Sequence, residues 1–106
     1  MKRKAFVIDG NNFNDEEGFY DEIYGLMAKD FYKKPKVGHN LNSLNDVLRG
    51  GFSAHKYGEP ILLKWINFEK SKKDLGQELV DTIIKIILDN SGHDCELITY
   101  DLEEAK

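Results

Sequence analysis

Three short runs of apolar residues along the chain have the composition of β-strands. They cover residues 4–8, 61–66 and 95–100, and each is followed by polar or turn-forming residues. Pro60 stands at the start of the second run, where proline is tolerated because the first amide of a strand need not join the hydrogen-bond ladder. We therefore predict three strands at these positions.

Between the predicted strands, apolar residues recur every three or four positions, which is the spacing of helices that bury one face. We expect four helices, over residues 15–29, 41–49, 68–75 and 76–89. The fourth segment has the strongest amphipathic pattern in the chain. The stretch between the first two helices contains a proline, a glycine and no clear period, so we interpret it as an irregular connection.

Local signals mark the ends of two of these helices. Asn14 is the residue that we expect to cap the first helix, with Glu17 reaching back from the third helical position as in a capping box. The pair Gly50 and Gly51 follows the second helix, and glycine commonly ends helices. A polar loop is expected from there to Glu59.

The order of these elements is strand, two helices, strand, two helices, strand. Helical crossovers join parallel strands, so this order predicts an α/β protein with a three-stranded parallel sheet and four helices. A chain of 106 residues with 41% hydrophobic and 32% charged residues is the size of one globular domain, and we expect residues 1–106 to form one.

Charge is distributed unevenly along the chain. Residues 9–22 carry six acidic side chains and no Lys or Arg, residues 29–58 carry six basic side chains against two acidic ones, and residues 74–106 carry nine acidic against two basic ones. Two acidic zones thus flank a basic middle. Phe31 and Tyr32 lie among the lysines of this basic zone, a mixture that can bind nucleic acid. The chain as a whole is acidic, however, and has no nucleic-acid-binding motif, so we favour a solvated loop over direct nucleic-acid binding.

The sequence predicts a soluble protein of a reducing compartment. No run approaches the roughly 18 apolar residues of a membrane span, and the basic start is followed by only a few apolar residues before Asp9. The single cysteine, Cys95, cannot form an internal disulfide, and we expect it to be a small buried residue. Cytoplasmic location and no membrane partner are the resulting expectations.

The sequence contains no recognisable catalytic or metal-binding motif. His39, His55 and His93 lie far apart without metal-ligand spacing, and no glycine-rich phosphate loop or nucleophile with a recognisable base is present. Trp65 lies in a predicted strand and is expected in the core. We therefore expect no metal, no cofactor and no enzymatic activity.

Polar residues gather on one side of the second predicted helix. Its apolar positions, at residues 41, 44, 47 and 48, define a buried face. Asn42, Asn45, Asp46 and Arg49 fall on the other side, where residues three and four apart are neighbours. This places one carboxylate on an exposed stripe that could contact a partner.

The segment GHNLNSLNDVLRGGF, residues 38–52, resembles the barstar family of bacterial ribonuclease inhibitors. Similarity in order and spacing extends to residues 5–10, to residues 61–72 and to the closing helix and strand, and so covers nearly the whole chain. The resemblance implies a three-layer α/β fold with a three-stranded parallel sheet and four helices, which agrees with the periodicity.

The resemblance also implies a mechanism without catalysis. Family members insert the second helix and the loop before it into the active site of a small secreted ribonuclease, in a 1:1 complex with a monomeric inhibitor. Asp46 matches the helix aspartate that occupies the phosphate pocket. The partner-binding residues implied in this chain are Gly38, His39, Asn40, Asn42, Asn45, Asp46 and Arg49, with Asp89 as a loose match to a carboxylate near the end of the last helix.

This chain departs from the family pattern at three positions. The position of Asn42 is often aspartate, that of Asn45 often carries a large aromatic residue, and an aromatic residue commonly stands where this chain has Val37. The basic middle zone also opposes attraction to a cationic active site. The target ribonuclease is therefore expected to differ from those of other members.

Two other functions compete with inhibition. Residues 7–12, VIDGNN, resemble the opening strand and turn of the PIN and NYN nucleases, in which Asp9 and Asp101 would hold a divalent metal. Asn67 stands where a further carboxylate is expected at the end of the second strand. The third possibility is a barstar-like module that binds another protein and has lost ribonuclease inhibition.

Overall fold

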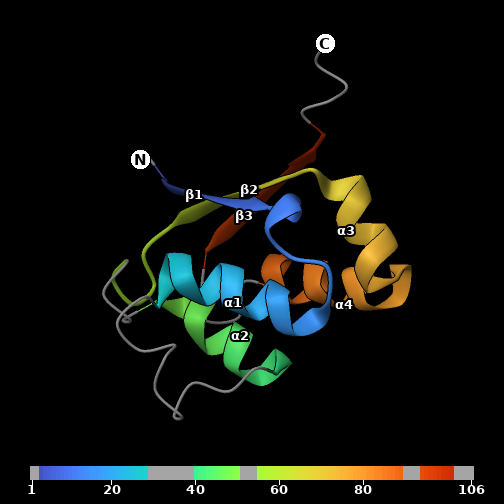
Figure 1. Ribbon diagram of the computed structural model, residues 1–106. Helices are drawn as coiled ribbons and strands as arrows, with labels where there is room; N and C mark the ends of the chain where they lie inside the picture. The colour runs from blue at the N-terminus through green and yellow to red at the C-terminus, as the bar shows by residue number, and fades with distance from the viewer. Residues whose placement is uncertain (1–2, 29–39, 51–54, 90–93, 102–106) are drawn as a thin grey trace.

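The computed structural model describes residues 3–28, 40–50, 55–89 and 94–101. These residues form three strands, four α-helices and one short 3-10 helix, labelled in Figure 1. In chain order the elements are β1 (Lys4–Asp9), η1 (Gly10–Asn12), α1 (Glu16–Met27), α2 (Leu41–Arg49), β2 (Ile61–Ile66), α3 (Phe68–Leu75), α4 (Gln77–Leu88) and β3 (Cys95–Tyr100).

The strands form one parallel sheet in the order β1-β2-β3, as the sequence predicts. Ile8 of β1 pairs with Trp65 of β2, which pairs in turn with Thr99 of β3. Alternate residues of the central strand, Ile61, Leu63 and Trp65, are fully buried on one face of the sheet. The side chains between them point to the opposite face, because strand side chains alternate.

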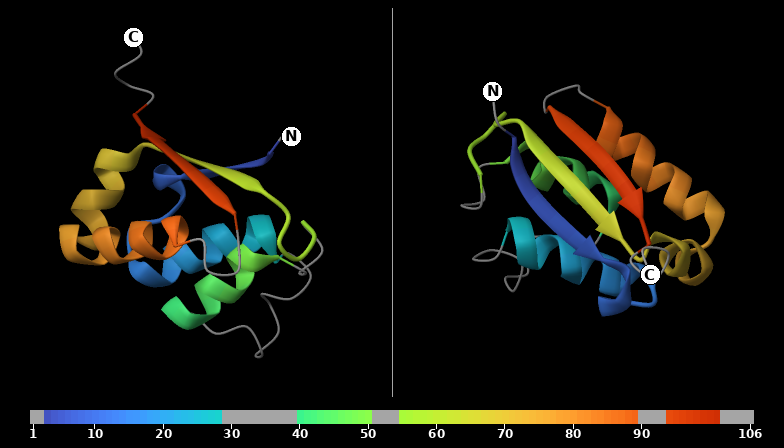
Figure 2. Two further views of the ribbon diagram at one scale, coloured as in Figure 1. Left: turned by 180° about the vertical axis from the view of Figure 1, so that it is seen from behind. Right: turned by 90° about the horizontal axis from the view of Figure 1, so that it is seen from above.

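The helices form two further layers on a single side of the sheet (Figures 1 and 2). Helix α1 packs against β1 and α4 packs against β3, while α2 packs against α1 and α4 rather than against the strands. The sheet, the α1/α4 pair and α2 are thus the three layers, and the expected three-layer α/β fold is confirmed. Of the described helices, none has both the length and the apolar character to cross a membrane.

Aromatic rings hold the sheet to the first helical layer. Phe19 of α1 stacks on Trp65, with ring centroids 5.3 Å apart and planes at 25°. The indole Nε1–H of Trp65 donates to Ser71 Oγ at 3.0 Å, so the buried polar atom of each side chain is satisfied. Trp65 is a core residue, as expected from its place in a strand.

The predicted start of α1 is wrong by one residue. Asp15, not Asn14, is the N-cap, and its carboxylate accepts a hydrogen bond from the Gly18 N–H at 2.8 Å. Glu17 is therefore the second residue of the helix and not the third, so the expected capping box does not apply. Both residues at 14 and 15 are good caps by type, and the extended backbone of Asp15 decides between them.

Candidate binding surface

Capping residues fix where α2 begins and ends. The Asn40 side chain accepts a hydrogen bond from the Ser43 N–H at 2.9 Å, so its oxygen is used by the helix itself. At the other end, Gly50 has φ of 98°, a conformation that side chains rarely adopt, and a Cβ there would meet the Lys56 carbonyl oxygen. The sequence indicated the glycine stop, but we did not identify Asn40 as the cap.

Helix α2 buries one face and exposes the other. Leu44, Val47 and Leu48 have at most 1% of their surface exposed and belong to the core. On the opposite side Asn42 and Asp46 are exposed, and Asn45 and Arg49 are half-buried. We call these four residues the α2 ridge. The sequence predicts that these four residues share one side of the helix, and this burial pattern agrees with that prediction.

Asp46 is the acidic residue of the α2 ridge, and its side chain is 66% exposed. The Arg49 guanidinium lies one helical turn away, with Nη1 3.9 Å from Asp46 Oδ1. Exposed ion pairs of this kind contribute about 0–1 kcal/mol, so the carboxylate can exchange this contact for stronger donors at little cost. Arg49 nevertheless reduces the negative charge that the ridge presents at long range.

A buried tyrosine from α1 supports the start of α2 from behind. The Tyr24 hydroxyl donates to the Asn40 carbonyl oxygen at 3.3 Å, and the residue is fully buried. Burial raises the pKa of Tyr24 well above its usual value, and the negative charge of Asp46 raises it further. The phenol therefore stays neutral and keeps its donor. The role of Tyr24 has no local sequence signal, because the contact joins residues 16 apart.

His55 holds the other end of α2. Its Nε2 donates to the Leu48 carbonyl oxygen at 3.1 Å, and the Gly58 N–H donates to the Arg49 carbonyl oxygen at 2.6 Å. Both carbonyls belong to the last turn of the helix, where they lack helical partners. His55 is only 4% exposed. The loop after α2, which we predicted to be polar, therefore includes a buried residue that fixes the end of α2.

The remaining predicted partner-binding residues are distributed as follows. Gly38 and His39 lie outside the described residues. Asp89 is exposed at the C-terminal end of α4, the helix that packs beside α2. Asp89 is thus on a different helix from Asp46, and its part in the same surface stays a prediction.

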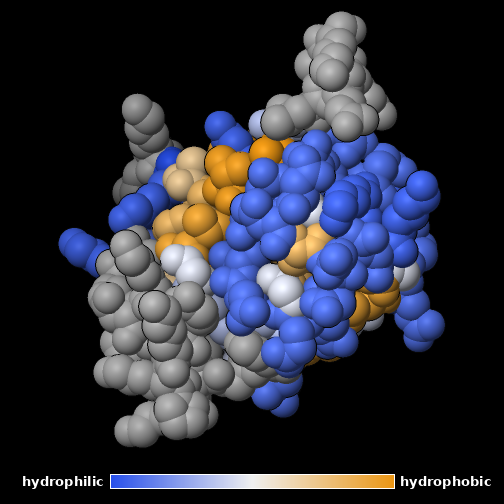
Figure 3. Space-filling view, in the orientation of Figure 1, coloured by the Kyte–Doolittle hydropathy of each residue, from blue (hydrophilic) through white to orange (hydrophobic). Residues whose placement is uncertain are grey.

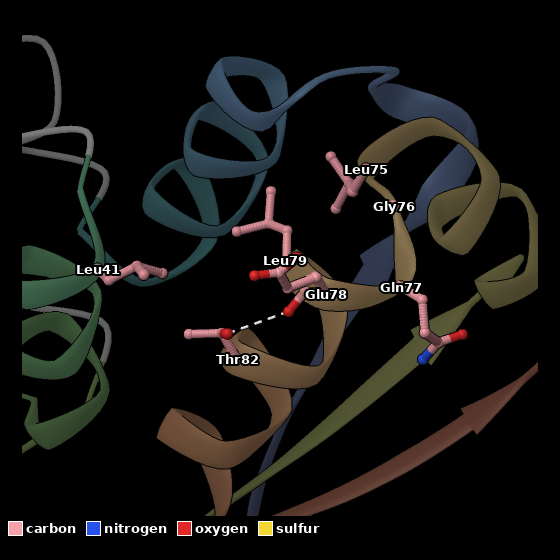
Figure 4. Close-up of a pocket in the computed structure, with 7 residues that line it drawn as sticks. All are labelled: Leu41, Leu75, Gly76, Gln77, Glu78, Leu79 and Thr82. Atoms are coloured by element: carbon pink, nitrogen blue, oxygen red, sulfur yellow. Dashed lines mark hydrogen bonds between the residues drawn. The ribbon is translucent and has the colours of Figure 1, made fainter.

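A cleft borders the N-terminal end of the α2 ridge (Figure 4). Leu41 of α2 faces it from one side, and Leu75 and Leu79 line it from the side of α3 and α4. Gln77, Glu78 and Thr82 add polar groups to the lining, and the Thr82 hydroxyl donates to the Glu78 carbonyl oxygen at 3.0 Å. An apolar side chain of a partner that covers Asn42 could contact this cleft.

The two carboxylates of the nuclease hypothesis have structural roles. Asp9 Oδ1 accepts from the Asn11 N–H and from the Asn67 amide, both at 2.9 Å, and Asp101 Oδ1 accepts from the Glu69 N–H at 3.0 Å. Asp9 ends β1 and Asp101 follows β3, with β2 between them, so their backbones lie about 10 Å apart. No group of three potential metal ligands occurs among the described residues.

Cys95 is 4% exposed at the start of β3, as expected, and burial raises the pKa of its thiol to about 12. The thiol is therefore protonated and unreactive at neutral pH. It serves as a small core residue and takes no part in the α2 ridge.

Comparison with known proteins assigns the chain to a family. No curated protein matches the sequence. The family model described as Barstar (barnase inhibitor) matches residues 3–97, which include every described strand and helix up to the third residue of β3. The fold agrees with this match, and the chain belongs to the barstar family.

Proposed function

We propose that this protein inhibits a small secreted ribonuclease by placing the α2 ridge in the enzyme's active site. The observation that carries the proposal is an exposed carboxylate, Asp46, on a helix fixed at both ends within a barstar-family fold. Asn42, Asn45 and Arg49 flank Asp46 in the contact, and Asn40, Gly38, His39 and Asp89 extend it. The protein acts by binding and is not an enzyme.

The chemistry of the target explains the choice of an acidic residue. A ribonuclease gathers Arg, Lys and His side chains to hold the phosphates of RNA, and a carboxylate accepts the same charge-assisted hydrogen bonds. Asp46 offers no bond to cleave, so it blocks the site. Because α2 is held by Asn40 and Tyr24 at one end and by His55 at the other, little ordering is left to be done on binding.

The composition of the ridge favours a target with fewer cationic groups than usual. Asn42 and Asn45 donate as well as accept hydrogen bonds, and Arg49 adds a positive charge 3.9 Å from Asp46. A strongly basic active site would repel Arg49. We propose that the cognate ribonuclease places a neutral carbonyl oxygen opposite Arg49.

The experiment is an RNA cleavage assay with a panel of barnase-like secreted ribonucleases. We expect cleavage by one of them to fall linearly as inhibitor is added and to reach zero at one inhibitor per enzyme. A monomeric protein and a complex of one chain each are expected in sedimentation. Cleavage of RNA by the protein alone, abolished by a metal chelator, would instead support the nuclease hypothesis.

The second candidate is a barstar-like module that binds another protein without inhibiting a ribonuclease. The position of Arg49 favours it, because a guanidinium 3.9 Å from Asp46 opposes the approach of the ridge to a cationic active site. Full cleavage by every enzyme of the panel at tenfold molar excess of this protein, with no complex in sedimentation, would favour this candidate. We expect the protein to act in the cytoplasm, before its target is exported, and to need neither membrane nor nucleic acid.

A further inference from the structure

The sheet has one face that the described helices leave open. Viewed from above, no described helix crosses in front of the three strands (Figure 2, right). On this face Val7, Ile98 and Tyr100 are 43%, 45% and 42% exposed, and these are large hydrophobic side chains. In Figure 3, which views the sheet from its β1 edge, hydrophobic side chains are visible along that edge. We call this surface, formed by Val7, Leu62, Lys64, Ile66, Ile98 and Tyr100, the open sheet face.

An exposed face is unusual for a sheet of this kind. Parallel sheets occur almost only with both faces covered, and their strands are accordingly apolar on both sides. Here β2 follows that rule, since Leu62 and Ile66 point to the open face while Ile61, Leu63 and Trp65 fill the core. β2 thus has the composition of a strand that is covered on both faces, although the described helices cover only one face of the sheet.

A single positive charge lies at the centre of the open sheet face. The register places Lys64 between Val7 and Ile98. No hydrogen bond or ion pair of the Lys64 ammonium is formed with the described residues. The nearby acids are engaged elsewhere, because Asp9 accepts from the Asn67 amide and Glu96 binds the Arg3 guanidinium at 2.7 Å. The face therefore offers an aliphatic surface with the Lys64 ammonium in its middle, and with the Asp9 and Glu96 carboxylates beside it, each bonded to another described residue.

These features define the shape and charge of an occupant. Two strand spacings make the face about 10 Å wide, which is the diameter of one α-helix. Six residues of strand extend about 20 Å, the length of about 13 helical residues. A helix with an aliphatic stripe and one central Glu or Asp would cover the aliphatic side chains and neutralise Lys64.

A second copy of the chain fits this surface less well. A two-fold axis through the centre of the face would place Lys64 of each copy against the other, which repels. The face is also small beside the roughly 800 Å² per partner of a standard interface. We propose that the open sheet face binds one amphipathic helix of another protein, with a central carboxylate paired to Lys64, on the opposite side of the molecule from the α2 ridge.

The test uses the full chain, labelled with ¹⁵N, and synthetic helical peptides of 15 residues. One peptide has a leucine stripe with a central Glu, and two matched peptides carry Gln or Lys at that position. We expect the Glu peptide to shift the amide signals of Val7, Lys64 and Ile98. It should bind roughly fivefold more tightly than the Lys peptide, the effect of about 1 kcal/mol for one partly exposed ion pair.

Charge reversal in the protein gives the decisive comparison. Lys64→Glu should reverse the order of the peptides, so that the Lys peptide binds more tightly than the Glu peptide. Ile98→Asp should abolish binding, whereas Leu88→Asp, an equally exposed leucine on α4, should leave binding unchanged. Circular dichroism of each variant establishes that it is folded before it is compared.

Three results would overturn the proposal. The first is an absence of shifts on the open sheet face with all three peptides. The second is equal binding of the three peptides to the wild type and to Lys64→Glu. The third is concentration-dependent signal changes in the free protein that disappear in Ile98→Asp, which would identify a second copy of the chain as the occupant.

Discussion

Arg49 Nη1 lies 3.9 Å from Asp46 Oδ1 across one turn of α2, so the acidic residue of the α2 ridge already has a cation beside it. The Asp46 side chain is 66% exposed and that of Arg49 32% exposed, and an ion pair so close to water is weak. The two residues therefore act oppositely toward a cationic enzyme. Asp46 provides the short-range hydrogen-bond acceptor, while Arg49 opposes the approach.

Replacing Asp46 by Ala tests the acceptor. We expect inhibition of the cognate ribonuclease to weaken by about 3–5 kcal/mol, at least about a hundredfold in Kd, because cationic groups of the enzyme would be buried without a partner. The free energy of unfolding should change by less than about 0.5 kcal/mol, because Asp46 is exposed. Enzyme titrations and urea denaturation measure the two quantities.

Glu96→Ala is the matched control, since it removes the same charge from an exposed residue of β3 whose position in the register is on the open sheet face. It should leave inhibition unchanged within a factor of about two. Equal inhibition by Asp46→Ala and wild type would remove Asp46 from the contact and with it the phosphate mimic.

Arg49→Gln tests the opposing cation. Removing the positive charge while keeping most of the side-chain length should raise the association rate constant several-fold at low salt, because the ridge becomes more acidic. The wild type and the variant should converge as salt screens the charges, over roughly the range in which the Debye length falls from about 30 Å to about 8 Å. Stopped-flow association across ionic strengths gives both results, and a slower variant at low salt would show that Arg49 meets an acidic group of the enzyme.

Local sequence signals located most of the secondary structure. The bounds of β2 follow from Pro60 at its start and Asn67 after it, and those of α2 from apolar spacing and Gly50. The choice between Asn14 and Asp15 as the cap of α1 could not be made, because both residue types accept the same hydrogen bond and only the backbone conformation separates them.

Long-range contacts of the site could not be predicted in this way. The α2 ridge itself follows from helical spacing, so Asp46 and its neighbours were identifiable. Tyr24 and His55, which fix the two ends of the ridge, contact α2 through tertiary packing that no local pattern encodes. The spacing of apolar residues predicts which face of a helix is exposed, but not which residues from other elements fix its position.

His55 makes the stability of the fold depend on pH. Burial lowers the pKa of His55 below its ordinary value of 6.5, with Lys4 nearby lowering it and Glu59 and the Leu48 carbonyl opposing the shift. Below pH 6.5 the unfolded chain binds a proton at this position that the folded chain does not, so the free energy of unfolding should fall as the pH falls. The fall should stop below the lowered pKa of the folded state.

His55→Gln isolates this effect, since the glutamine amide can donate to the Leu48 carbonyl oxygen but does not titrate. We expect the free energy of unfolding of the wild type to drop relative to that of the variant as the pH falls below 6.5. Urea denaturation at a series of pH values measures the difference, and parallel curves would exclude His55 as its source.

Two glycines should respond oppositely to the same substitution. Gly10 is buried at the start of η1, and a Cβ there would lie 2.5 Å from Ser71 Oγ and also meet the Asn67 carbonyl oxygen. Ser71 Oγ accepts the hydrogen bond of Trp65, so a shift of that side chain would disturb the core. Gly25 lies within α1, where nothing occurs within 4 Å of an added Cβ. Thermal or urea unfolding should therefore show Gly10→Ala to be destabilised by about 1–3 kcal/mol and Gly25→Ala to be stabilised by about 0.5–1 kcal/mol, because alanine restricts the unfolded chain and favours the helix. A stabilised Gly10→Ala variant would contradict the close packing of η1 against α3.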